Sequence, residues 1–207
     1  LVGSEMCIRD RLKPDFSSDC APMLTLVMAL AVAKGIRQTL RRDSEEAAAK
    51  VGIKWPNDIV VDGKKVCGIL TEMSMEQGYI QHIVIGVGIN VRKQEFPEEI
   101  RDRAAAIDEQ CGFRISRSQL IADIMEAFEE DYEIFLRTHD LKGLRASYAE
   151  LLVNQDREVC VLDPKGEYRG IARGINDQGE LLVERQDGTV EEVYAGEVSV
   201  RGIYGYV

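Results

Sequence analysis

The chain has 207 residues and a formal net charge of −10, so it can bury a substantial core in one large domain or two, and its acidic balance argues against broad binding to nucleic acid or anionic membranes. Its five cysteines are odd in number and never in C-x-x-C spacing, which suggests reduced thiols rather than a disulfide framework or a zinc site. The two histidines give little material for a metal cluster or a Ser-His-Asp triad, and we expect a cytoplasmic protein.

The first segment, Leu1–Arg11 (LVGSEMCIRDR), fits no helix or strand pattern well. Similar strings occur as spurious starts in assembled sequence data. We therefore interpret residues 1–11 as a non-native prefix and expect the native chain to begin near Leu12.

A buried helix is predicted next. Ser18 or Asp19 can cap it, Pro22 lies in its first turn, and apolar residues continue to about Leu40. Its most apolar part, Met23–Ala33, is too short to span a bilayer. We interpret it as a core helix and expect no membrane association.

Four strands follow, and their alternating or continuously apolar runs define them. They are expected at Val51–Trp55, Ile59–Val61, Lys65–Met73 and Tyr79–Val87. The Asp62-Gly63 pair predicts a hairpin between the second and third of these strands.

A polar turn, Lys54-Trp55-Pro56-Asn57-Asp58, stands between the first two strands. Pro56 favours an extended conformation for Trp55, so the Lys54 side chain should project from a strand end. Trp55 is as consistent with a core position as with a ligand contact. Asn57 and Asp58 can shape the turn or bind a nucleotide or metal.

Two glycines, Gly86 and Gly88, come at the end of the fourth strand and allow close approach by a ligand or by another strand. A dinucleotide fingerprint requires a third glycine where Val91 stands, and no G-x-x-x-x-G-K-[ST] loop occurs in the sequence. We therefore reject the dinucleotide and P-loop interpretations.

The second half of the chain changes from helices to short strands. An amphipathic helix is predicted over Ser118–Arg137 and a further helix over Leu141–Val153. The apolar face of the first is assigned to the core and comprises Leu120, Ile121, Ile124, Met125, Phe128, Tyr132 and Phe135. Strands are then expected at Val159–Leu162, Tyr168–Ile175, Leu181–Val183, Val190–Val193 and Val198–Arg201. Their spacing, with tight turns such as Asp163-Pro164-Lys165-Gly166, is typical of a small β-barrel.

Three motifs in order resemble the catalytic core of biotin protein ligases: the Lys54–Asp58 turn, Gly68-Ile69-Leu70-Thr71-Glu72, and Gly86-Val87-Gly88-Ile89-Asn90-Val91. Gly174-Ile175-Asn176 and Ala195-Gly196-Glu197-Val198-Ser199 resemble the SH3-like C-terminal domain of the same family. The resemblance implies an α+β fold. A mixed-sheet biotin/lipoate ligase-like catalytic domain would cover residues 12–154, and a small SH3-like β-barrel residues 155–207.

The resemblance also implies roles for individual residues. Lys54 would be the catalytic residue, touching both the biotin carboxylate and the adenylate phosphate. The biotin site would comprise Lys54, Trp55 and Gly68. The ATP or adenylate site would comprise Lys54, Asn57, Asp58, Gly86, Gly88 and Asn90. No residue is assigned as a metal ligand.

The implied activity is ATP-dependent formation of biotinyl-5′-AMP, followed by transfer of biotin to a lysine of the biotin carboxyl carrier protein of acetyl-CoA carboxylase. ATP and biotin would be substrates, with Mg²⁺ accompanying the nucleotide, and a fixed lysine would stabilise the charge that develops where two anions meet. The alternatives are a lipoate ligase or transferase of the same fold, a biotin-responsive repressor that lacks its DNA-binding module, or a stable domain without activity. A homodimer is a possible assembly, since family members often dimerise through the central sheet.

One family feature is missing from the sequence. Biotin ligases carry a G-R-G-R-x-G-R loop before the helix predicted at Pro22, and no such run occurs here. Because that loop closes over biotin and the phosphates, we interpret the chain as a fragment and expect weak or no adenylation from it.

Overall fold

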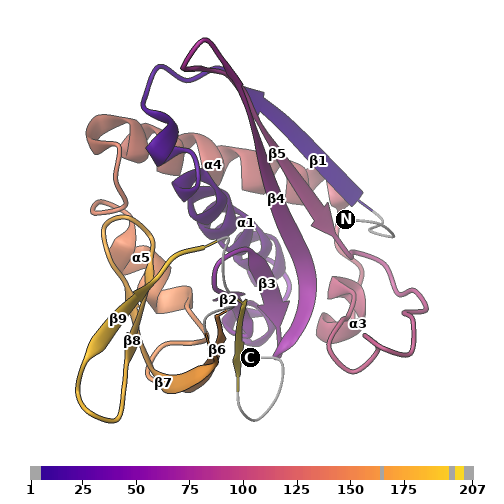
Figure 1. The fold of residues 1–207 in the computed structure, drawn as a ribbon. Coiled ribbons are helices and arrows are strands. Elements are labelled where there is room, and N and C mark those ends of the chain that lie inside the picture. Colours follow the sequence, from indigo (N-terminus) through magenta and orange to yellow (C-terminus); the bar gives the residue numbers. More distant parts are fainter. Residues whose placement is uncertain (1–5, 164–165, 196–198, 203–207) are drawn as a thin grey trace.

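The computed structural model describes residues 6–163, 166–195 and 199–202. These residues form two five-stranded antiparallel sheets, with strand orders β1-β5-β4-β3-β2 and β10-β6-β7-β8-β9 (Figure 1). The first sheet contains β1 (Met6–Leu12), β2 (Val51–Lys54), β3 (Asp58–Val61), β4 (Lys64–Glu76) and β5 (Tyr79–Ile89). The second contains β6 (Glu158–Leu162), β7 (Tyr168–Ile175), β8 (Leu181–Glu184), β9 (Val190–Val193) and β10 (Ser199–Gly202).

The helices are η1 (Ser18–Cys20), α1 (Met23–Arg41), α2 (Glu45–Ala49), α3 (Ile107–Cys111), α4 (Arg117–Thr138) and α5 (Arg145–Leu151). In Figure 1, α1 and α4 lie behind the first sheet, and α5 lies on the side of α1 that faces the second sheet. The α+β fold class is therefore confirmed. Closure of the second sheet into a barrel stays a prediction.

Helix α1 is the centre of the core. By length and composition Ser18–Arg41, which contains the apolar stretch Met23–Ala33, could cross a membrane. However, 72% of its most apolar stretch is buried inside the protein, where it packs on the sheet and on α4. The N-cap is Pro22, with no side-chain hydrogen bond, and neither Ser18 nor Asp19 caps α1 as predicted.

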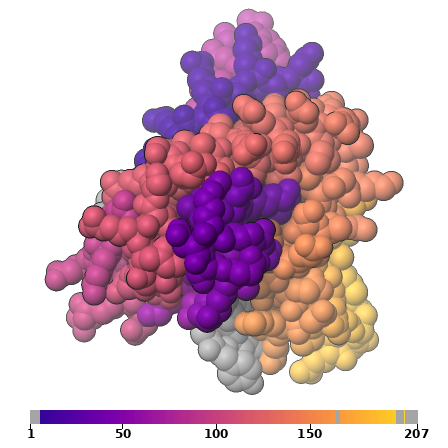
Figure 2. All heavy atoms as spheres, turned by 180° about the vertical axis from the view of Figure 1, so that it is seen from behind, coloured from indigo at the N-terminus to yellow at the C-terminus, as the bar shows by residue number. Residues whose placement is uncertain are grey.

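Contacts between α1 and α4 are both apolar and polar, and Figure 2 shows α4 crossing this helical face of the molecule. Asp123 accepts a hydrogen bond from Thr39 Oγ1 at 2.6 Å and pairs with Arg42. Burial pushes the pKa of Asp123 upward, but the hydrogen bonds from Arg42 and Thr39 outweigh burial and hold that pKa below its usual value. Lys34 Nζ lies 2.5 Å from Oδ1 of the fully buried Asp131, whose pKa burial raises.

Strand β1 corrects one expectation about the start of the chain. Met6–Leu12 pairs with Ile83–Ile89 of β5 along its whole length, so the expectation that residues up to Arg11 fit no element is wrong from Met6 onward. A short strand with three charged residues carries a weak pattern by itself. Backbone pairing with β5, which lies far along the sequence, defines it. The non-native origin of residues 1–11 stays a prediction, and Leu1–Glu5 lie outside the described residues.

Two further differences concern the helices, and part of the predicted C-terminal turns cannot be compared. Helices α2 and α3 occupy segments that carry no predicted helix. Ile121 of α4 is 38% exposed, so its assignment to the core face is wrong. The turn residues 164–165 and the motif residues 196–198 lie outside the described part of the chain.

Gly35 lets α1 and α4 approach closely, and replacing it tests the packing. A methyl group added there would lie 2.6–2.7 Å from the side chain and backbone of Ile124. Alanine is favoured over glycine in helices by about 1 kcal/mol, whereas overpacking costs about 1–3 kcal/mol or more. Because backbone atoms cannot rotate away, we expect Gly35→Ala to lower the free energy of unfolding in a denaturant titration.

The control is Arg41→Ala on the same helix, where an exposed i,i+4 pair with Glu45 is lost and about 0.3–0.5 kcal/mol is expected. A Gly35→Ala protein more stable than the unsubstituted chain would contradict the close contact.

Candidate functional site

Four predicted site residues lie in one row across the first sheet. Lys54 pairs with Asp58, Asp58 with Gly68, and Gly68 with Gly88. Directly paired residues of adjacent strands project on the same face of a sheet. We call Lys54, Asp58, Gly68 and Gly88 the central row.

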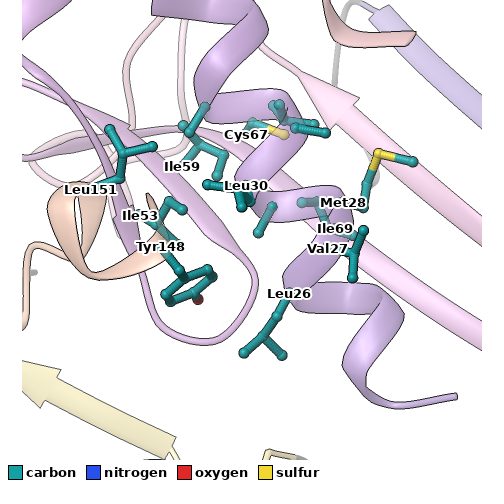
Figure 3. Close-up of a cluster of buried hydrophobic side chains, with 14 of the residues drawn as sticks. Leu26, Val27, Met28, Leu30, Ile53, Ile59, Cys67, Ile69, Tyr148 and Leu151 are labelled. Atoms are coloured by element: carbon teal, nitrogen blue, oxygen red, sulfur yellow. The ribbon is translucent and has the colours of Figure 1, made fainter. Parts of the chain in front are cut away.

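The neighbouring row projects on the other face and belongs to the core. Ile53, Ile59, Cys67 and Ile89 are paired in the same way and are each at most 1% exposed. Figure 3 shows the first three of these side chains gathered with residues of α1. Because side chains alternate along a strand, the central row projects away from α1.

The side chain of Lys65 reaches over the central row, and the sequence analysis did not select this residue. A methyl group added at Gly68 would lie 3.2 Å from Cε and Nζ of Lys65 and 3.7 Å from Oδ1 of Asp58. The Lys65 ammonium group therefore lies above Gly68, and its Nζ is 2.5 Å from Asp58 Oδ1. The backbone of Lys65 is fixed as well, because its N–H donates to Arg103 O at 2.8 Å and its carbonyl accepts from Ala105 N at 2.9 Å.

The two lysines of the site differ in exposure. Lys54 is 7% exposed, whereas the side chain of Lys65 is 37% exposed and the Asp58 carboxylate beside it is largely covered. An ammonium group that is held by a covered carboxylate and still reaches solvent can meet an incoming anion. Lys65 is therefore a second candidate, beside Lys54, for the cation that meets a ligand, and the role of each lysine stays a prediction.

The two asparagines are fixed by the ends of the strands. Asn57 Nδ2 donates to Ile69 O at 2.9 Å, and Ile69 N donates back to Asn57 O at 3.0 Å. Asn90 follows directly after β5, its N–H donates to Val66 O at 2.8 Å, and its Oδ1 accepts from Gln94 Nε2 at 3.1 Å. Asn57 directly precedes β3 and Asn90 directly follows β5, so the two residues lie on opposite sides of the central row.

Gly86 lies one step further along the same face, paired with Leu70. Leu70 is 52% exposed, so an apolar side chain lies open to solvent beside the glycines. Gly68, Gly86 and Gly88, which we call the glycine face, add no side chains of their own, although Lys65 lies over Gly68 and Gly88 is buried. Close approach by a ligand at these glycines stays a prediction.

Trp55 is not part of this face. Its side chain is 2% exposed, and its indole Nε1 donates to Gly179 O at 2.9 Å. The structure thus places the indole in the core, in contact with the turn before β8. Its predicted biotin contact gains no support from this position. The Trp55–Pro56 peptide bond is cis.

A cavity of about 360 Å³ lies beside the Lys54–Asp58 turn, and of the predicted site residues only Asn57 lines it. The lining residues are Ala21, Pro22, Thr25, Pro56, Asn57, Ile69, Leu70, Thr71, Met73 and Ala195. Its volume is in the range of small-molecule pockets. Leu70 lines this cavity and is also paired with Gly86, so the cavity lies next to the glycines.

Cys67 lies next to the site but is a packing residue. Burial raises the pKa of its thiol, and the nearby Asp58 carboxylate raises it further, so the thiol is neutral and a weak nucleophile. Within the described residues, no three His, Cys, Asp or Glu side chains are grouped so that they could hold a metal ion.

Two segments of the chain match known protein families. Residues 6–90 match the Biotin/lipoate A/B protein ligase family, and residues 156–201 match the Biotin protein ligase C terminal domain. The bifunctional ligase/repressor BirA of Bacillus subtilis is 34% identical over 91% of this chain and 56% of its own length. The chain belongs to the biotin protein ligase family. The first match begins at Met6, the first residue of β1, and so includes residues before Leu12, where the native chain was expected to begin.

Two further relatives extend the comparison. The biotin–[acetyl-CoA-carboxylase] ligase of Paracoccus denitrificans is 25% identical over 89% of this chain and 78% of its own length. The biotin protein ligase of Aquifex aeolicus in complex with biotin and ATP superposes with a TM-score of 0.77 at 26% identity, over 95% of this chain and 78% of that one. The family likeness thus covers both sheets, while the chain spans about half the length of its Bacillus subtilis relative, 56%.

Gly68→Ala tests the placement of Lys65. The added methyl group would meet the flexible end of the Lys65 side chain, so that end should move away from residue 68 while the fold is retained. We expect a crystal structure to show a displaced Lys65 Nζ, and a denaturant titration to show a smaller loss of stability than for Gly35→Ala, where backbone is in the way. An unmoved Lys65 would contradict the close contact above Gly68.

Proposed function

We propose that the chain is the catalytic part of a biotin–[biotin carboxyl-carrier protein] ligase. It would join biotin and ATP into biotinyl-5′-AMP and pyrophosphate, and then transfer biotin to a lysine of the biotin carboxyl carrier protein of acetyl-CoA carboxylase. The observation that carries the proposal is the Lys65 ammonium group above Gly68 and beside Asp58, on the sheet face that carries Gly68, Gly86 and Gly88. A cytoplasmic location accords with this activity.

In the first step, a carboxylate oxygen of biotin attacks the α-phosphorus of ATP. A new P–O bond forms, the bond from the α-phosphorus to the bridging oxygen breaks, and pyrophosphate leaves. Two anions must approach each other, so a cation fixed where they meet stabilises the transition state. Lys65 is held for this role by Asp58, and Lys54 stands at the end of the same row.

Magnesium would enter with the nucleotide. Mg²⁺ is commonly bound by one or two carboxylates together with substrate phosphates. Asp58 is a candidate carboxylate for such a contact, and no group of three ligands occurs among the described residues. The described residues therefore fit a metal that arrives with ATP, with Asp58 as its candidate protein contact.

In the second step, the ε-amine of the carrier lysine attacks the acyl carbon of biotinyl-5′-AMP. The C–N bond of the amide forms, the C–O bond to the phosphate breaks, and AMP leaves with the negative charge. Lys65 would again stabilise that charge, and no nucleophile from this chain is needed.

Two alternatives involve the same fold. A lipoate ligase would activate a different carboxylate by the same chemistry, but the match to a biotin protein ligase C-terminal domain favours biotin. A repressor role is suggested by the name of the Bacillus subtilis relative, a bifunctional ligase/repressor. The net charge of −10 gives this chain no general affinity for DNA.

The roles of the lysines can be separated by substitution. We expect Lys65→Met to lower biotin-dependent ATP–pyrophosphate exchange about 10²-fold, the typical effect of removing one transition-state donor. Lys54→Met should lower the rate as well, because Lys54 stands at the end of the same row. Lys64→Met is the matched control in the same strand and should leave the rate unchanged. Normal exchange by Lys65→Met together with a large loss in Lys54→Met would contradict the assignment of Lys65.

Transfer to the carrier is tested directly by mass spectrometry. The chain, in excess, is incubated with biotin, MgATP and an isolated biotin carboxyl carrier domain. We expect slow modification of one carrier lysine, because no G-R-G-R-x-G-R loop occurs in the sequence to close over the phosphates. The modification should require biotin and ATP and should not occur with lipoate. A carrier mass that stays unchanged, or that rises equally with lipoate, would contradict the proposed function.

A further inference from the structure

The turn that carries Lys54, Asn57 and Asp58 is held from outside the first sheet. Trp55 N donates to Asn154 Oδ1 at 3.0 Å, and Trp55 Nε1 donates to Gly179 O at 2.9 Å. We call these two hydrogen bonds the Trp55 clamp. Its partners lie 99 and 124 residues further along the chain.

The Gly179 side of the clamp is rigid. Asn176 Oδ1 accepts from Gln178 N at 3.0 Å and from Glu180 N at 2.9 Å, which fixes the turn between β7 and β8. Gly179 has a φ of +82°, and a methyl group there would lie 2.9 Å from Leu26 and 2.9 Å from Leu141. The glycine carbonyl is therefore packed in one position against the indole.

The Asn154 side is equally fixed. Asn154 is 1% exposed and lies between α5 and β6. The preceding Val153 N donates to Ile53 O at 2.9 Å, so the segment runs beside the end of β2. Asn154 Oδ1 consequently reaches the main chain of the residue that follows Lys54.

We propose that Asn154 is a positioning residue for the ligation reaction. Through the Trp55 amide it sets the place of the turn, and with it the places of Lys54, Asn57 and Asp58. Asp58 in turn holds Lys65. A displacement of about 1 Å in a group that orients the reaction can cost about 10²-fold in rate. The catalytic consequence rests on the proposed function, whereas the placement of the turn does not.

Two substitutions separate positioning from stability. Asn154→Ala removes the acceptor, and Asn154→Asp retains an oxygen acceptor of the same size. A carboxylate at a site that is 1% exposed is costly to bury, so Asn154→Asp should be no more stable than Asn154→Ala. Activity should follow the opposite order. Gln155→Ala is the matched control, because the neighbouring Gln155 donates its side-chain Nε2 to the exposed Asp156 at 3.2 Å and is not part of the Trp55 clamp.

The first measurement is independent of activity. Amide NMR shifts of Trp55, Asn57 and Asp58 and hydrogen exchange of the Trp55 amide are recorded on the full 207-residue chain. We expect large shift changes and lost protection in Asn154→Ala, and near-original values in Asn154→Asp and Gln155→Ala. Unchanged turn amides in a folded Asn154→Ala protein would overturn the proposal.

The second measurement is biotin-dependent pyrophosphate exchange, well below the melting temperature of each variant. We expect at least a tenfold lower kcat in Asn154→Ala with a smaller change in KM for ATP, and recovery in Asn154→Asp. Exchange that tracks melting temperature, or that is normal while the turn amides move, would overturn the proposal. If the unsubstituted chain shows no exchange, the proposed function fails for this chain, and the NMR result alone decides whether Asn154 positions the turn.

Discussion

The ion pair between Lys65 and Asp58 is the interaction on which the site depends. In the proposed reaction, an ammonium group has to be held where two anions approach, and solvent cannot hold a long flexible lysine in one place. Asp58 fixes its end at 2.5 Å, and the missing side chain of Gly68 leaves room for it. The backbone of Lys65 is hydrogen-bonded to the 103–105 segment, so the whole residue is fixed at both ends.

The packing of the sheet makes this arrangement possible. One row of the sheet is apolar and fully covered by α1, and the adjacent row projects on the opposite face and carries the charged groups and glycines. A shift of one residue in any strand would exchange the two rows. The buried row, which includes Ile53, Ile59 and Cys67, therefore fixes the register that aligns Lys54 with Asp58 and Asp58 with Gly68.

Local signals in the sequence predicted much of the first sheet. The Asp62-Gly63 hairpin is confirmed, with φ values of 51° and 74° that suit these residue types. Lys65 could not be selected in the same way, because a register irregularity between Ile59 and Val60 decides which residue of β4 lies beside Asp58. Strand β1 was missed for a similar reason, since its partner residues in β5 lie 71 to 83 positions away and its own sequence is short and charged.

Trp55 illustrates the limit for single residues. Its sequence context is equally consistent with ligand binding and with burial, and the deciding partner is the carbonyl of Gly179, 124 residues away. Contacts of this range depend on how the second sheet packs against the first. For the same reason the sequence motifs predicted which segments meet at the site, but not that Asn154 holds one of them.

The most direct measurement is a crystal structure of the chain with a stable analogue of biotinyl-5′-AMP. We expect the phosphate to lie on the glycine face, with Lys65 Nζ within about 2.7–3.2 Å of a phosphate oxygen. We also expect Asp58 and Gly68 to remain directly beneath the Lys65 ammonium group. An analogue bound with its phosphate away from the central row, and with Lys65 in contact only with Asp58, would contradict the account.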